Sequence, residues 1–143
     1  MTANEWGLVD SNILIYAFDS SEGQKHERAK RFLFERLDAH DACVSIQNLV
    51  EFHANATGRI QAPISMELSK TTLNKLSNTL MVIEYGFQTV LHAISYQQSK
   101  GVPFWDALLI ATMEENSVGL IYTEDEKHFQ GIPWLKVLNP LKG

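Results

Sequence analysis

The sequence predicts a three-layer α/β/α domain with a mostly parallel central sheet of about four to five strands. Short apolar runs alternate along the chain with longer segments of helical periodicity, which is the pattern of consecutive strand–helix–strand units. The length of 143 residues fits one domain, which we expect to span residues 1–143. The composition, 45% hydrophobic and 20% charged, is that of a chain able to build its own core.

The expected elements follow from this alternation. Apolar runs predict strands over residues 7–9, 42–46, 81–85, 119–122 and 135–138. Helical spacing predicts helices over residues 13–18, 25–37, 66–80, 89–100 and 104–116, and a further helix carrying residues 49–52. Ser45 is a candidate cap for that further helix, residues 58–63 interrupt the pattern, Gly101 is placed to end a helix and Pro103 to open the next.

Charge and cysteine content exclude several classes of protein. Twelve Lys and Arg against 17 Asp and Glu give a net charge of −5, which argues against nucleic-acid binding by bulk charge alone. A metal ion or a local basic face remains open as a means of holding nucleic acid. Cys43 is the single cysteine, so an intrachain disulfide and a cysteine-rich zinc site are excluded, and we expect it to be a small buried hydrophobe. Residues 1–6 lack a basic leader and no apolar run is long enough for a membrane span, so we expect a cytoplasmic protein.

Four acidic residues occur where a solvated surface charge is not expected. Asp10 and Asp125 each follow an apolar strand, and the carboxyl ends of parallel strands meet at one edge of a sheet. Glu51 lies between two apolar residues of the helix after the second strand, and Asp106 lies in an apolar first turn after Pro103. We therefore expect the four carboxylates to converge at one edge.

Converging carboxylates indicate a particular chemistry. They repel one another, and a hard divalent cation with oxygen ligands relieves that repulsion. Mg²⁺ or Mn²⁺ fits an oxygen-only set, whereas zinc prefers His and Cys. Such an ion can polarise a phosphoryl oxygen and lower the pKa of bound water, so phosphodiester hydrolysis is the reaction this set suits best.

Each acid also has an ordinary structural explanation. Asp10 can cap the following helix, Asp106 can be a first-turn acid, and Glu51 can point to solvent. Asp125 lies in an acidic run of three residues, 124–126, which is typical of a solvated turn. Spacing alone leaves both explanations open for each residue.

The order of the motifs adds a resemblance to a known family. Residues 7–14 (GLVDSNIL), 48–52 (NLVEF), 104–111 (FWDALLIA) and 121–125 (IYTED) resemble the four acidic motifs of the PIN-domain family, and more narrowly those of VapC-type toxins from bacterial toxin–antitoxin pairs. The resemblance runs from Leu8 to Pro140 and includes the closing segment 134–140. It implies a PIN-like domain and a metal-dependent endoribonuclease.

The resemblance also implies roles for individual residues. Asp10, Glu51, Asp106 and Asp125 match the family's acidic quartet, with Asp10 and Asp106 as the main metal ligands. Asp125 and Glu51 would bind the metal directly or through water and orient the nucleophile. Of these two, Asp125 is also expected to be a metal ligand. Asn12 and Thr123 match the polar positions that support the site. Because the chain departs from the family pattern after residue 125, either Glu124 or Asp125 could face the metal, and the register of the motif favours Asp125.

The partners implied by the resemblance are an RNA substrate, a cognate antitoxin protein and a second copy of the chain in a homodimer. Residues 13–18 and the basic helix 25–37 are candidate antitoxin surfaces, although core packing has the greater weight for 13–18. The basic residues of 25–37 could follow RNA phosphates or form a solvated helix face. Trp105 could stack on a base, with core packing favoured, and no histidine is given a catalytic role.

Two other classes of function compete with the nuclease. One is a non-catalytic PIN-like module that dimerises or binds a partner. The presence of all four acidic residues argues against it. The other is a phosphohydrolase for small phosphate esters, which lacks support because the sequence contains no glycine-rich phosphate loop.

Overall fold

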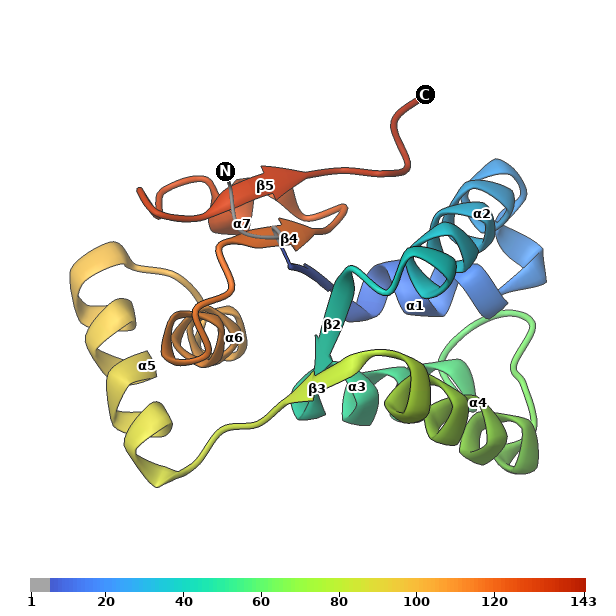
Figure 1. Ribbon diagram of the computed structural model, residues 1–143, viewed down its shortest axis with the longest axis horizontal. Coiled ribbons are helices and arrows are strands. Elements are labelled where there is room, and N and C mark those ends of the chain that lie inside the picture. The colour runs from blue at the N-terminus through green and yellow to red at the C-terminus, as the bar shows by residue number, and fades with distance from the viewer. Residues whose placement is uncertain (1–5) are drawn as a thin grey trace.

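A five-stranded sheet forms the centre of the computed structural model, which describes residues 6–143 (Figure 1). Residues 1–5 lie outside the described part. They belong to the predicted domain and to the N-terminal segment in which no basic leader was expected. The strands are β1 (Gly7–Val9), β2 (Ala42–Ser45), β3 (Met81–Ile83), β4 (Leu120–Tyr122) and β5 (Lys136–Leu138). Their order is β3-β2-β1-β4-β5 and every neighbouring pair is parallel, which confirms the predicted sheet.

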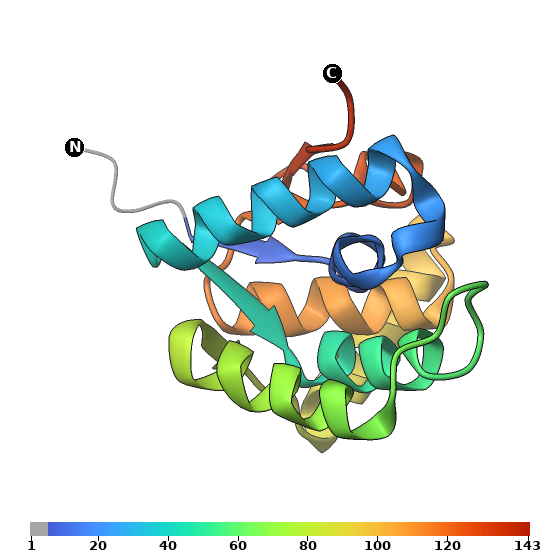
Figure 2. The same cartoon turned by 90° about the vertical axis from the view of Figure 1, so that its right-hand side faces the viewer.

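Helices cover both faces of the sheet, as the two perpendicular views show (Figures 1 and 2). They are α1 (Ser11–Phe18), α2 (Gln24–Ala39), α3 (Ile46–Ala56), α4 (Met66–Thr79), α5 (Phe87–Lys100), α6 (Phe104–Glu115) and α7 (Glu126–Phe129), with a short 3₁₀ helix at Ser20–Glu22. Helices α1 to α4 lie on one face, and α5 and α6 lie on the other. The predicted three-layer α/β/α architecture is therefore confirmed.

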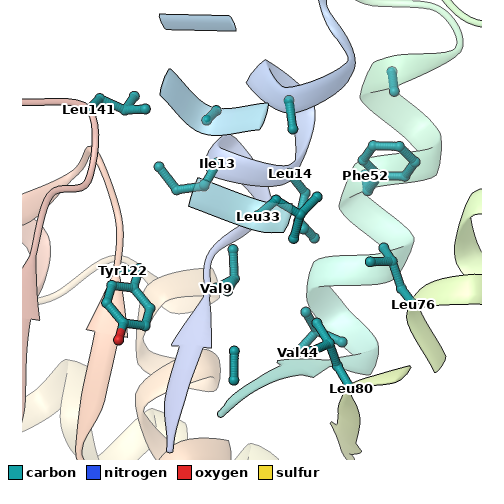
Figure 3. Packing of buried hydrophobic residues seen from close by; sticks show 14 of the residues in the cluster. Val9, Ile13, Leu14, Leu33, Val44, Phe52, Leu76, Leu80, Tyr122 and Leu141 are labelled. Atoms are coloured by element: carbon teal, nitrogen blue, oxygen red, sulfur yellow. The ribbon is translucent and has the colours of Figure 1, made fainter. Parts of the chain in front are cut away.

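Side chains alternate along the strands between two apolar cores. Val9, Val44 and Tyr122 pack with α1 to α4 (Figure 3). Leu8, Cys43 and other side chains of the opposite face pack mainly against α6. Because both faces are covered, the strands read as continuous apolar runs. Cys43 is buried as expected, and burial raises the pKa of its thiol to about 12.

The predicted helix boundaries are confirmed where the sequence supplies a cap. The Ser45 hydroxyl accepts a hydrogen bond from the Asn48 N–H at 3.0 Å, and the Asn48 side chain accepts one from the Ser45 N–H at 3.0 Å. This reciprocal pair ends β2 at Ser45 and begins α3 at Ile46, one residue before the predicted end of the strand. Gly101 ends α5 in the left-handed region, with φ of 70°.

Two segments differ from the expectation. No helix was predicted after residue 123, yet the acidic run 124–126, for which a solvated turn was one of two open interpretations, leads into α7, because Phe129 on that short helix is fully buried in the core beneath it. Strand β3 ends at Ile83 rather than at residue 85, where the side chain of Tyr85 is exposed. Over residues 6–143, no helix combines the length and the apolar character needed to cross a membrane.

Candidate active site

The four predicted acids line one small pocket at the carboxyl edge of the sheet. Its volume is about 210 Å³ and its lining residues are Asp10, Ser11, Asn12, Ile15, Gln47, Glu51, Asn55, Asp106, Leu109 and Asp125. The acids come from the end of β1, from α3, from the first turn of α6 and from the loop after β4. No Lys or Arg is among the lining residues, so the described walls carry carboxylates without basic side chains to neutralise them.

Asp10 is the most deeply buried of the four, with 7% of its surface exposed. Its Oδ1 accepts a hydrogen bond from the Ser11 N–H at 2.7 Å, so Asp10 does cap α1 while it also lines the pocket. Its Oδ2 accepts a hydrogen bond from the Thr123 hydroxyl at 2.8 Å. Burial nevertheless raises the pKa of Asp10 from its ordinary 3.8 to about 7; the bonds from Thr123 and Ser11 lower it, whereas the charges of Glu51 and Asp125 raise it.

Asp125 is tied to Asp10 through the two predicted supporting residues. The Asn12 amide donates to Asp125 Oδ2 and to the Thr123 hydroxyl oxygen, both at 3.2 Å. That hydroxyl also accepts from the Asp125 N–H at 3.0 Å and itself donates to Asp10. Asn12 and Thr123 thus connect the first and the last acidic motif.

Glu124 points to a different set of partners from Asp125. Its Oε2 lies 2.6 Å from Lys25 Nζ, and its Oε1 accepts a hydrogen bond from the Tyr16 hydroxyl at 2.7 Å. These bonds to Lys25 and Tyr16 lower the pKa of Glu124 against the effect of its partial burial. Of the two candidates, Asp125 is therefore the one that lines the pocket.

Glu51 and Asp106 are each held by a neighbouring side chain. Glu51 Oε1 accepts a hydrogen bond from the Ser11 hydroxyl at 3.0 Å. Asp106 Oδ2 lies 2.8 Å from His128 Nδ1. Burial raises the pKa of Asp106, and the neighbouring imidazole of His128 acts in the opposite direction.

The donor set fits a hard divalent cation by its chemistry. Four carboxylates share one pocket, and the buried Asp10 would be stabilised in its charged form by a positive ion. Within residues 6–143, no three His, Cys, Asp or Glu side chains are already arranged to hold an ion together. The carboxylates are occupied instead by bonds to neighbours such as Ser11, Asn12 and His128, and an ion would have to replace some of these bonds.

The sequence interpretation overlooked several residues at the pocket. Ser11 and Asn48 lie inside the acidic motifs, and Asn48 Nδ2 lies 3.4 Å from Asp10 Oδ1. Gln47 lies one helical turn before Glu51, so its i, i+4 spacing was the available signal. Nothing in the sequence indicated that His128 would contact Asp106.

The structure also shows where Trp105 and the basic side chains of α2 lie. Trp105 is 61% exposed, so the favoured prediction of core packing is wrong, because the first turn of α6 turns this side chain outward. On α2, three of the predicted basic residues are engaged within the protein: Lys25 pairs with Glu124, Arg36 pairs with Asp41 at 2.6 Å, and Arg28 donates to the Leu141 carbonyl at 2.8 Å. The helix is therefore not a continuous free basic surface.

Solved structures with this fold include several toxin–antitoxin assemblies. A toxin–antitoxin complex from Klebsiella pneumoniae is 24% identical, covers 94% of this chain and 97% of its own, and has a TM-score of 0.67. The Mycobacterium tuberculosis toxin VapC20, described as cleaving the sarcin–ricin loop, is 17% identical, covers 87% and 94%, and has a TM-score of 0.66. DNA-bound VapBC from Salmonella typhimurium is 18% identical, covers 94% and 98%, and has a TM-score of 0.64. At these identities the likeness shows a shared fold.

A comparison with curated proteins found no match. The family model of the PIN domain, in contrast, matches residues 7–135, which is most of the chain and includes all four acidic motifs. The chain therefore belongs to the PIN-domain family.

Proposed function

We propose that this protein is a metal-dependent endoribonuclease that acts as the toxin of a toxin–antitoxin pair. The observation that carries the proposal is the pocket in which Asp10, Glu51, Asp106 and Asp125 meet without a basic side chain in its lining. A protein gains no stability from grouping carboxylates in this way, since their mutual repulsion opposes folding. The PIN family and the VapC fold of its structural neighbours support the same assignment.

In this proposal Mg²⁺, or Mn²⁺ in its place, is held by Asp10, Asp106 and Asp125. When bound, such an ion polarises a phosphoryl oxygen and lowers the pKa of water. Thr123 and Asn12 keep Asp10 and Asp125 at fixed positions. Glu51, held by Ser11, orients the attacking water by accepting a hydrogen bond from it. The water oxygen forms a bond to phosphorus as it loses a proton, the bond from phosphorus to the departing ribose oxygen breaks, and that oxygen takes up a proton.

The antitoxin, in our proposal, docks in an apolar groove between α2 and α4. The groove has a volume of about 560 Å³ and is lined by residues of both helices, by the end of α1 and by Ile64. Phe34, which is 59% exposed, and Leu68 offer apolar surface there. Several structural neighbours are complexes of such toxins with their antitoxins. This location agrees with helix 25–37 as a candidate antitoxin surface, whereas Ile13 and Leu14 of segment 13–18 are buried in the core as expected.

A second copy of the chain is proposed to cover an exposed apolar stripe on α5. Phe87, Leu91 and Ile94 recur at helical spacing on this helix and are all exposed. A homodimer would remove this surface from water. The proposal also places the protein in the cytoplasm, in agreement with its single unpaired cysteine.

One observation favours the alternative of a non-catalytic partner-binding module. The carboxylates of the pocket already have protein partners, and no three of the described ligand-type side chains are arranged to share an ion. In a binding module the acidic residues would serve only to make these structural hydrogen bonds.

Cleavage of total cellular RNA by the purified protein separates these two functions. We expect discrete fragments with Mg²⁺ or Mn²⁺, none with EDTA, and none from folded Asp10→Asn or Asp106→Asn variants. Asp38→Asn, at an exposed position of α2, is the matched control and should cleave like the parent. Identical RNA patterns for all four proteins would favour the binding module.

A further inference from the structure

Gln47 is a buried polar residue of the pocket for which the proposed mechanism has no use. It lies on α3 one turn before Glu51 and lines the pocket, yet only 6% of its surface is exposed. Long polar side chains are seldom buried to this extent unless their polar atoms are paired. The hydrogen bonds of its carboxamide therefore require an explanation.

The amide nitrogen of Gln47 has partners that fix the orientation of the group. Nε2 donates to the Trp105 carbonyl oxygen at 2.9 Å and lies 3.5 Å from Glu51 Oε2. Both neighbours are acceptors, so the nitrogen must face them and the carbonyl oxygen must face elsewhere. This oxygen, Oε1, is buried and has no hydrogen-bond partner among the described residues.

The polar side chains around the pocket do not provide the missing donor. The Ser11 hydroxyl donates to Glu51, and the Asn12 amide donates to Thr123 and Asp125. The Asn55 amide donates to the Glu51 carbonyl oxygen at 2.8 Å. The remaining polar groups of the lining are carboxylates, which in their charged form only accept. None of these hydrogen bonds reaches Gln47 Oε1, which leaves its acceptor capacity free for a donor brought by a bound ligand.

We propose that Gln47 Oε1 accepts a hydrogen bond from a hydroxyl group bound in this pocket, an inference that rests on the proposed nuclease function. Two sources supply this chemistry: the ribose 2′-hydroxyl of the bound RNA and a water molecule carried by the cation. A carboxamide provides the acceptor without adding a fifth negative charge to the four carboxylates. In the first case Gln47 selects RNA over DNA, because the 2′-hydroxyl is the group that distinguishes them.

The test replaces Gln47 by Met, which keeps the length of the side chain and removes the carboxamide. Gln98→Met, at an exposed position of α5, is the matched control. The RNA probe is an oligonucleotide spanning a cleavage site mapped in total RNA, with either a 2′-hydroxyl or a 2′-fluoro group at the scissile nucleotide. The metal probe is MnCl₂ alone, titrated by calorimetry, so this arm does not depend on RNA cleavage.

The two sources give different results. If the donor is the ribose, the parent cleaves the 2′-fluoro oligonucleotide at least about tenfold more slowly than RNA, and Gln47→Met cleaves both at similar rates. If it is water on the cation, the parent cleaves both alike, and Gln47→Met binds Mn²⁺ about tenfold more weakly, as is typical when a group outside the ligand set is lost.

Gln47→Asn, which withdraws the carboxamide by one methylene, serves as a second variant and should show the same loss if Gln47→Met fails to fold. The proposal is overturned if a folded Gln47 variant matches both the parent and Gln98→Met, within twofold, in substrate discrimination and in Mn²⁺ affinity. Absence of RNA cleavage by the parent itself contradicts the proposed function instead, and the calorimetric comparison then decides the role of Gln47.

Discussion

Replacing Asp10 by Asn should change how the stability of the protein depends on pH. Asp10 is almost fully buried, and burial raises the pKa of its carboxyl to about 7 in the folded protein, from an ordinary value of 3.8. The folded state therefore holds a proton on Asp10 that the unfolded state releases at much lower pH. Asn cannot titrate, so the variant lacks this linkage between proton binding and folding.

The direction and size of the effect follow from the two pKa values. Because the folded pKa is the higher one, the stabilising contribution is fully present below about pH 4 and is lost as the pH rises through about 7. The separation of about three pH units corresponds to about 4 kcal/mol of unfolding free energy in total. Of this, about 2.6 kcal/mol is lost between about pH 5 and about pH 8.

Urea unfolding in EDTA at several pH values measures this contribution. We expect the unfolding free energy of the parent, relative to Asp10→Asn, to fall by about 2.6 kcal/mol from about pH 5 to about pH 8. Comparing the two proteins cancels the titration of the other carboxylates and any constant cost of the Asn side chain. At pH 8, Mg²⁺ should stabilise the parent and leave the variant unchanged. Parallel pH profiles for the two proteins would refute the reasoning.

Three further changes have expected outcomes. Thr123→Val removes the hydroxyl that donates to Asp10 Oδ2 at 2.8 Å and should lower the unfolding free energy at pH 5 by about 1–3 kcal/mol, measured with urea; an unchanged midpoint would count against the bond. Phe34→Glu places a charge in the α2–α4 groove and should abolish co-purification of the cognate antitoxin while RNA cleavage is retained; normal co-purification would place the antitoxin elsewhere. Leu91→Glu on the exposed stripe of α5 should convert a dimer to a monomer in light scattering, and an unchanged mass would reject that interface.

The strands and most helices were predictable because the signals are local. Apolar runs buried on both faces identify β1, β2 and β4, and Ser45 and Gly101 mark helix ends through their own backbone and side-chain bonds. Helix α7 was not predictable from its acidic sequence. Its formation depends on the burial of Phe129 in a core assembled from distant segments.

The sequence predicted the positions of the acidic residues better than it predicted the side chains that contact them. Parallel strands bring Asp10 and Asp125 to one sheet edge by topology alone, and the structure places both in the same pocket. The contact of His128 with Asp106 depends on how α7 meets α6. The direction of Trp105 depends on how α6 begins. Such contacts are set by packing angles that no local pattern encodes.

Anomalous diffraction from crystals soaked in MnCl₂ tests the central claim, that the four carboxylates form the metal centre of a nuclease. The account predicts a manganese peak in the pocket, coordinated by Asp10, Asp106 and Asp125, with Asp106 turned from His128 toward the ion. The peak should vanish in Asp10→Asn crystals. A pocket without manganese in fully soaked crystals of the parent, with the carboxylates still bonded to Ser11, Asn12 and His128, would contradict it.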